Sequence, residues 1–130
     1  TYGFLYNWQS ANEACPDGWH LPSVDDWNEL INYLGGEDIA GGKLKETGTL
    51  HWKSPNEGAS NESEFTCLPG GFYNSTTGHF QLLTQNAIFW TSTPIDTITA
   101  SLFTLNYANS TVTSTLNHKE SKLSVRCLKD

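Results

Sequence analysis

Positive charge is scarce in this sequence, and its scarcity argues against two large classes of partner. The chain has only seven Lys and Arg residues against fourteen Asp and Glu, which gives a net charge of −7. Proteins bind phosphate backbones and anionic membrane surfaces mainly through Lys and Arg. We therefore expect neither a nucleic acid nor an anionic membrane as partner.

The sequence also lacks methionine and any apolar run long enough to cross a bilayer, so we expect no membrane span. No signal-like stretch is present, which suggests a mature or trimmed form whose targeting segment is missing. The abundance of Ser, Thr, Asn and Trp is typical of bacterial surface proteins. We expect an extracellular or outer-membrane location, with lipid anchoring through the missing N-terminal segment as an open option.

What is present favours one well-packed domain. The chain of 130 residues has the size of a common domain, and we find neither an internal repeat nor a second domain. Five Trp, five Tyr and six Phe residues exceed what disordered chains carry. We therefore treat residues 1–130 as a single folded unit.

Three cysteines allow one disulfide bond and leave one thiol over. We favour a bond between Cys15 and Cys127, while bonds of Cys67 with either of the other two remain open. Cys67 lies in an apolar run, so we expect a buried and unreactive thiol there.

The clearest helix begins after Ser23. Serine is a good N-cap, and Asp26 three residues later completes the pattern of a capping box. Apolar residues then follow at helical spacing until the glycine pair 35–36 ends the pattern. These residues are Trp27, Leu30, Ile31 and Leu34.

Helical signals dominate the first third of the chain, and strand signals dominate the second half. The order indicates an α+β domain with an antiparallel sheet, one side of which would face solvent. Between the halves lies a long polar loop at 46–64, and loops of such length are often functional. The other expected elements are a strand at 3–6, helices at 8–15 and 39–45, an extended segment at 19–22, and strands at 65–68, 71–73, 80–83, 87–92, 101–107, 111–116 and 122–128.

Five ordered blocks run nearly from end to end of the chain. They are ACPDGWHLPS at 14–23 with Trp27 after it, AGGKLK at 40–45, LPGGF at 68–72, FWTST at 89–93 and SVRCLKD at 124–130. In this order they resemble the Fibrobacter succinogenes major paralogous domain.

The resemblance implies a C-type-lectin-like fold, with two helices flanking small twisted antiparallel sheets and the N- and C-terminal strands paired. It also supports the bond between Cys15 and Cys127, which would join the first helix to the last strand. At Cys67 the chain departs from the small residue usual in that family, which fits a free thiol. Such domains are typical of secreted or lipid-anchored proteins of Bacteroidetes-like bacteria, often without an established activity.

The tryptophans divide by position. Trp19, Trp27 and Trp90 lie in structural-looking blocks and are expected in the core, while Trp52 in the long loop is expected to be the most exposed. For Trp8 the sequence favours neither the core nor the surface.

Signals for a metal, a cofactor or catalysis are weak. The four histidines lack zinc-site spacing, and the acidic groups at 37–38 and 57–64 lack the short motifs of calcium-dependent lectins. No nucleophile elbow or phosphate loop is present. Formylglycine-generating enzymes, of broadly similar fold, use two active-site cysteines, and only Cys67 is spare here. We therefore expect no cofactor, no metal and no enzyme.

The stretch 91–121 is rich in Thr, Ser, Asn and Asp, and it resembles the changeable region of variable proteins of diversity-generating retroelements. We therefore predict a surface module that binds a protein or a glycan through this face. A structural subunit of an envelope protein is the alternative, and a formylglycine-type enzyme is a weaker one. The candidate ligand-binding residues are Asp96, Thr97, Thr104, Asn106, Tyr107, Asn109, Thr111, Thr113, Asn117 and His118.

Overall fold

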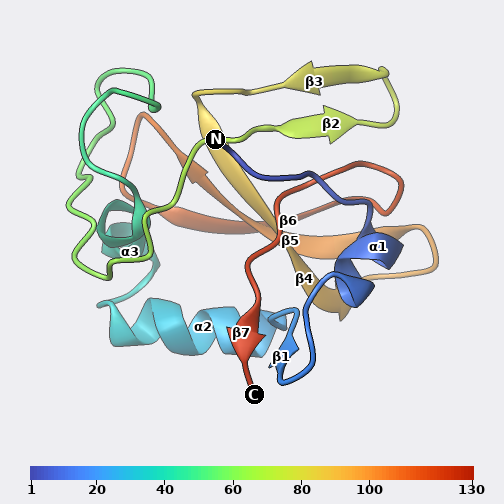
Figure 1. The fold of residues 1–130 in the computed structure, drawn as a ribbon. Coiled ribbons are helices and arrows are strands. Elements are labelled where there is room, and N and C mark those ends of the chain that lie inside the picture. Colours follow the sequence, from blue (N-terminus) through green and yellow to red (C-terminus); the bar gives the residue numbers. More distant parts are fainter.

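A computed structural model describes all of residues 1–130 and confirms an α+β architecture with small antiparallel sheets. Helices α1 and α3 flank the central sheet on opposite sides, and α2 lies below it (Figure 1). In chain order the elements are α1 (Trp8–Glu13), β1 (Trp19–His20), α2 (Val24–Tyr33), α3 (Glu37–Leu44), β2 (Phe72–Asn74), β3 (His79–Gln81), β4 (Asn86–Pro94), β5 (Thr99–Asn106), β6 (Val112–His118) and β7 (Leu128–Lys129).

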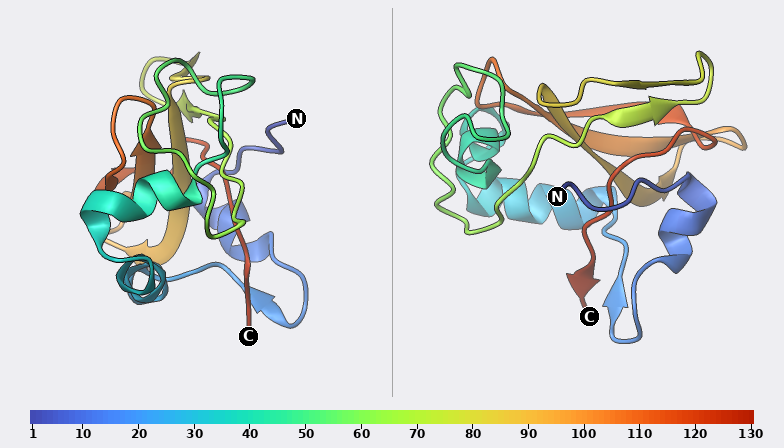
Figure 2. Two further views of the ribbon diagram at one scale, coloured as in Figure 1. Left: turned by 90° about the vertical axis from the view of Figure 1, so that its left-hand side faces the viewer. Right: turned by 45° about the horizontal axis from the view of Figure 1, so that its top comes forward.

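The strands form three separate sheets. The central sheet has the order β4-β5-β6, the hairpin β2-β3 forms the second, and β1 pairs with β7 in the third. The hairpin and the β1-β7 pair lie at opposite ends of the molecule in all three views (Figures 1 and 2). None of the helices has the length and apolar character that a bilayer-spanning segment requires.

Helix α2 forms as its sequence predicts. The Ser23 side chain accepts a hydrogen bond from the Asp26 backbone N–H, and the Asp26 carboxylate accepts one from the Ser23 N–H. Trp27, Ile31 and Leu34 are buried and Leu30 is partly buried. Local capping and periodicity therefore suffice to place this helix.

Helix α3 confirms the prediction of a helix at 39–45 but begins earlier, at Glu37, and ends at Leu44. Its middle consists of glycines because it packs directly on backbone. A Cβ atom at Gly41 would lie 2.6 Å from the carbonyl oxygens of Ser110 and Thr111. Any larger residue at this position would push α3 away from the turn that joins β5 to β6.

The central sheet is buried on both sides, which corrects the expected solvent-facing side. Leu102 and Phe103 are neighbours on β5 and point to opposite faces of the sheet, each into a different core. Both are at most 3% exposed. Only β6 has a run of exposed side chains, Thr113–Leu116. The core under α2 and α3 contains Trp27, Ile31, Leu34, Ala40, Leu44, Trp52, Cys67, Ala87, Phe89, Phe103, Leu105 and Val112. The core near α1 contains Ala11, Leu21, Ile88, Trp90, Ala100, Leu102 and Leu123.

The two ends of the chain are fastened together. Cys15 and Cys127 form a disulfide bond, as predicted. Tyr6 and Leu123 exchange two backbone hydrogen bonds of 2.8 and 2.9 Å. Cys67 is free and fully buried, which confirms the expected burial of the thiol.

Three predicted strands are wrong. Segments 3–6, 65–68 and 122–128 contribute only isolated bridges, apart from Leu128 in β7. The segment before β7 cannot join one sheet because its backbone bonds change partner. Lys122 bonds to Tyr73, Leu123 to Tyr6 and Ser124 to Ile88.

Two predictions for tryptophan are wrong as well. Trp52 is 1% exposed, because the 46–64 loop folds inward and its indole N–H donates to the Cys67 carbonyl at 2.9 Å. Trp19 is 44% exposed, because β1 pairs only with the short strand β7 and nothing else covers it. Trp27 and Trp90 lie in the core as predicted.

His20 connects α2 to the chain end and makes the protein sensitive to pH there. Its two ring nitrogens lie 2.7 Å from an Asp130 carboxylate oxygen and 3.0 Å from one of Asp26. The hydrogen bonds to Asp130 and then to Asp26 raise the pKa of His20 above its ordinary 6.5.

A histidine with a raised folded-state pKa stabilises the fold fully below the unfolded value, and this stabilisation is lost as pH rises through the folded value. We expect NMR titration to give His20 a pKa above 6.5 that falls in Asp130→Asn. A His20 pKa unaffected by that substitution would contradict the contact.

Candidate functional site

The ten predicted ligand-binding residues do not form one site. Register pairs Thr99 with His118 at one end of β5 and Leu105 with Val112 near the other. Asp96, Thr97, Asn117 and His118 therefore lie at the first end, with Asn106, Tyr107, Asn109 and Thr111 at the second and the pair Thr104 and Thr113 between them.

The second end is a structural joint centred on Lys45. Its ammonium donates to the backbone carbonyls of Glu57, Asn106 and Asn109 at 2.8, 3.0 and 2.8 Å. The residue is fully buried, and burial lowers the pKa of Lys45 to about 8. Its ammonium also lies 5.4 Å from the Trp52 ring centroid. This arrangement ties the 46–64 loop to the β5–β6 turn.

Side chains in the middle of the predicted face are occupied by one another. The Asn86 amide donates to the Thr104 hydroxyl at 3.1 Å, and the Asn106 amide donates to the Asn86 carbonyl oxygen at 3.2 Å. The Asn106 side chain also accepts from the Ala108 N–H. Most other side chains at these positions would break this polar row, so Thr104 and Asn106 stabilise the sheet.

Asp96 shapes the turn between β4 and β5. One of its carboxylate oxygens accepts hydrogen bonds from the N–H groups of Ile98 and Thr99 and from the Thr99 hydroxyl, at 2.8 to 2.9 Å. The bond from the Ile98 N–H, followed by the Thr99 bonds, lowers the pKa of Asp96. The carboxylate therefore stays ionised and fixes Thr97 at the tip of the turn.

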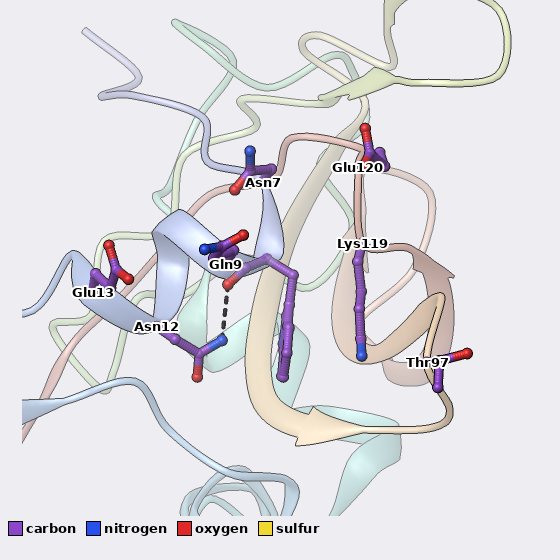
Figure 3. A pocket seen from close by; sticks show the side chains of 8 residues that line it. Asn7, Gln9, Asn12, Glu13, Thr97, Lys119 and Glu120 are labelled. Atoms are coloured by element: carbon purple, nitrogen blue, oxygen red, sulfur yellow. Dashed lines mark hydrogen bonds between the residues drawn. The ribbon is translucent and has the colours of Figure 1, made fainter.

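A groove of about 460 Å³ lies between α1 and this turn (Figure 3). Its walls come from three segments that are far apart in the sequence: α1, the β4–β5 turn and the residues just after β6. Only one of its lining residues is hydrophobic. The lining residues are Asn7, Trp8, Gln9, Asn12, Glu13, Thr97, Lys119 and Glu120.

Hydrogen bonds hold these three segments in fixed relation. The Trp8 indole N–H donates to the Thr91 carbonyl at 2.8 Å, and the Trp8 backbone N–H donates to the Lys119 carbonyl at 2.9 Å. The Lys119 backbone N–H in turn donates to the Ile98 carbonyl at 2.9 Å. The groove is therefore preformed.

Lys119 adds a positive charge on the aromatic ring. Its ammonium lies 4.4 Å from the Trp8 ring centroid and donates to the Asp96 carbonyl at 2.7 Å. A cation over an aromatic face is attracted by the ring quadrupole. Lys119 therefore braces Trp8 against the turn, and Asp96 supports the groove through its backbone.

Polar side chains around the groove floor, which Trp8 and Lys119 form, are free to bind a ligand. Gln9, Glu13, Thr97 and Glu120 are exposed, and their side chains make no hydrogen bond within the chain. The Asn7 side chain is used as the cap of α1, and the Asn12 amide donates to the Trp8 carbonyl. Both amides nevertheless keep one group unused by these bonds.

Of the predicted residues, only Thr97 lines the groove, while Asp96 positions it and Asn117 and His118 lie close by at the end of β6. Sequence reasoning missed the α1 residues. The available signal was a short helix that begins with a tryptophan and, apart from the buried Ala11, carries polar side chains. No local signal connects that helix to a turn almost ninety residues later.

The acidic residues considered for calcium do not converge. No group of three or more His, Cys, Asp or Glu side chains is placed to hold a metal ion. In the long loop, Glu62 instead lies 3.8 Å from the Lys43 ammonium.

Comparison with known proteins shows a family match. A family model described as the Fibrobacter succinogenes major domain matches residues 1–129. No curated protein and no solved structure matches the chain.

Proposed function

The chain belongs to the Fibrobacter succinogenes major domain family, and from that premise we propose that it is a non-catalytic module of the bacterial cell surface that binds a glycan. The ligand site is the groove between α1 and the β4–β5 turn. The observation that carries the proposal is a preformed floor, Trp8 braced by Lys119, surrounded by polar side chains without partners. The fold assignment that accompanies it is C-type-lectin-like, supported by the fastened chain ends and the small sheets.

A glycan suits this lining better than other small ligands do. Sugar hydroxyls both donate and accept, and so do the amide of Gln9 and the hydroxyl of Thr97, while Glu13 and Glu120 accept. Trp8 is half-buried, and the part of its ring that the core and Lys119 leave uncovered offers an apolar surface for the C–H groups of a sugar ring. Since the floor is fixed beforehand, little conformational entropy would be lost on binding.

Support for a non-catalytic role comes from Cys67, the one free thiol. Burial raises its pKa strongly, so the thiol stays protonated and cannot act as a nucleophile. Support for a location outside the cytoplasm comes from the disulfide bond, since such bonds persist in oxidising compartments.

We expect the double substitution Gln9→Ala and Glu13→Ala to weaken glycan binding by about 10- to 100-fold. Each lost hydrogen bond contributes about 0.5–1.5 kcal/mol, and 1.4 kcal/mol is a tenfold change in affinity. A glycan array probed with the whole domain would identify the sugar, and calorimetry with that sugar would measure both proteins. The melting temperature should stay unchanged, since both side chains are exposed.

The matched control is Asn28→Ala with Glu29→Ala, which removes an exposed amide and an exposed carboxylate from α2 instead. It should bind as the unmodified protein does. Equal affinity of all three proteins would refute the groove as the site. A blank array would refute the glycan proposal and favour the structural-subunit alternative.

A further inference from the structure

The two edge strands of the central sheet differ in whether other segments of the chain form backbone hydrogen bonds with them. At the β4 edge, the Trp90 N–H donates to the Ser124 carbonyl at 3.1 Å, and the Ser124 N–H donates to the Ile88 carbonyl at 3.0 Å. The Gly71 N–H covers the Asn86 carbonyl at 2.9 Å. No segment bonds in this way to the middle of β6, which forms the opposite edge.

The bonds at β4 also determine which groups of β6 point outward. Because Asn86, Ile88 and Trp90 bond away from β5, the residues between them bond to β5. The alternation then makes Leu102 and Thr104 of β5 bond to β6, where they pair with Thr115 and Thr113. Ser114 and Leu116 of β6 consequently direct their N–H and C=O groups away from the sheet.

Strand β6 has none of the features that usually prevent an edge strand from pairing with another chain. Native proteins protect exposed edge strands with lysine, proline, bulges or a covering segment. Residues 112–118 contain no charged residue, proline or glycine, and their register with β5 has no interruption. The side chains of Thr113, Ser114, Thr115 and Leu116 are exposed, and Leu116 is 51% exposed.

We propose that β6 pairs antiparallel with β6 of a second copy of this chain, around a two-fold axis at Thr115. Thr115 is the middle residue of the seven in β6, so this register uses the whole strand. Ser114 of each copy then lies opposite Leu116 of the other, and their outward N–H and C=O groups form four hydrogen bonds. The result is one continuous sheet of six strands across the two copies.

The sequence of the strand favours a second copy over a foreign peptide. An isologous interface must be complementary to itself. In this register Thr115 meets Thr115 and Thr113 meets Asn117, so small polar side chains face each other and no like charges do. Each copy carries a net charge of −7, and none of that charge lies on β6.

The sharpest test is crosslinking through the axis. In this register Thr115 occupies a non-hydrogen-bonded pair with itself, where Cα atoms lie about 4.5 Å apart, within the range of a disulfide. We expect Thr115→Cys to form a covalent dimer on mild oxidation. Thr113→Cys is the matched control and should not crosslink, because its partner in the dimer is Asn117. Cys67 is buried and takes no part.

Sedimentation velocity over a range of protein concentrations supplies the second test. The unmodified domain should form a concentration-dependent dimer. Ser114→Pro removes an outward N–H, and Leu116→Lys places like charges close together across the axis, so both should be monomeric. Leu83→Lys is the control, since Leu83 is 53% exposed but lies outside β6; it should dimerise normally.

A monomer at every concentration would overturn the proposal, as would a dimer that persists in Leu116→Lys. Crosslinking of Thr113→Cys instead of Thr115→Cys would overturn the register. These results are independent of the glycan site, because none of the altered residues lines the groove.

Discussion

Replacing Cys15 and Cys127 together with serine will lower the free energy of unfolding by about 4.7 kcal/mol in the chain-entropy account of disulfides. The bond joins residues 112 positions apart, so it restricts almost the whole unfolded chain. A loss of this size is a large part of the stability of an ordinary domain, which lies at about 5–15 kcal/mol. Urea unfolding of the oxidised protein and of the variant measures the difference.

Cys67→Ala is the control for this experiment. It also removes a sulfur atom but leaves the disulfide bond intact, and we expect a loss of about 1 kcal/mol, as for a typical substitution. If the double variant loses no more unfolding free energy than Cys67→Ala does, the disulfide bond does not stabilise the fold by restricting the unfolded chain.

Lys45→Met is expected to lower the free energy of unfolding by about 3 kcal/mol. The change keeps most of the side-chain volume but leaves three carbonyls in partly buried surroundings without the ammonium that bonds to them. A fully buried acceptor left without a partner costs about 1–3 kcal/mol, and partial burial and the removal of a buried charge reduce the sum for these three. Hydrogen exchange should rise in the 46–64 loop and in the β5–β6 turn together, because Lys45 is the contact that they share.

The contribution of Lys45 to the free energy of unfolding depends on pH in a defined direction. Burial lowers the pKa of Lys45 from its ordinary 10.5 to about 8. Between these values the unfolded chain holds a proton that the folded chain has released, so stability rises with pH. The stability of the unmodified protein relative to Lys45→Met should therefore increase from pH 8 to pH 10.5.

Lys53→Met serves as the control, because the exposed Lys53 ammonium only lies over the Tyr107 ring, 4.9 Å from its centroid. Exposed contacts of this kind contribute about 0.5–1 kcal/mol. Equal losses of unfolding free energy in Lys45→Met and Lys53→Met would mean that the hydrogen bonds of Lys45 to carbonyls stabilise the fold no more than an exposed cation–π contact does.

Features that depend on neighbours in the sequence could be predicted from it. Ser23 and Asp26 cap α2 within four residues, and the apolar spacing after them marks its buried face. The disulfide bond could be predicted because three cysteines allow only three pairings and the family pattern favours one of them. These signals require no knowledge of the packing.

Features that depend on distant contacts could not be predicted. Trp52 in a polar loop looks exposed until Lys45 and Asn56 draw that loop inward; the Asn56 amide donates to the Glu46 and Gly48 carbonyls at 2.9 and 2.7 Å. The groove joins α1 to a turn near residue 97, and neither segment indicates the other. A polar stretch such as 91–121 likewise cannot show which of its side chains are already hydrogen bonded to one another.

The covalent link between the chain ends also determines how the molecule responds to mechanical load. A pulling force between residues 1 and 130 passes from Cys15 to Cys127 through the sulfur atoms, so the chain between them carries no tension. Helix α1 lies before Cys15 and therefore in the stretched part, whereas Thr97 and Lys119 lie in the shielded part. Traction would therefore unfold one wall of the groove while the other stayed folded, so a ligand held there, as we propose, would be released before the central sheet unfolds.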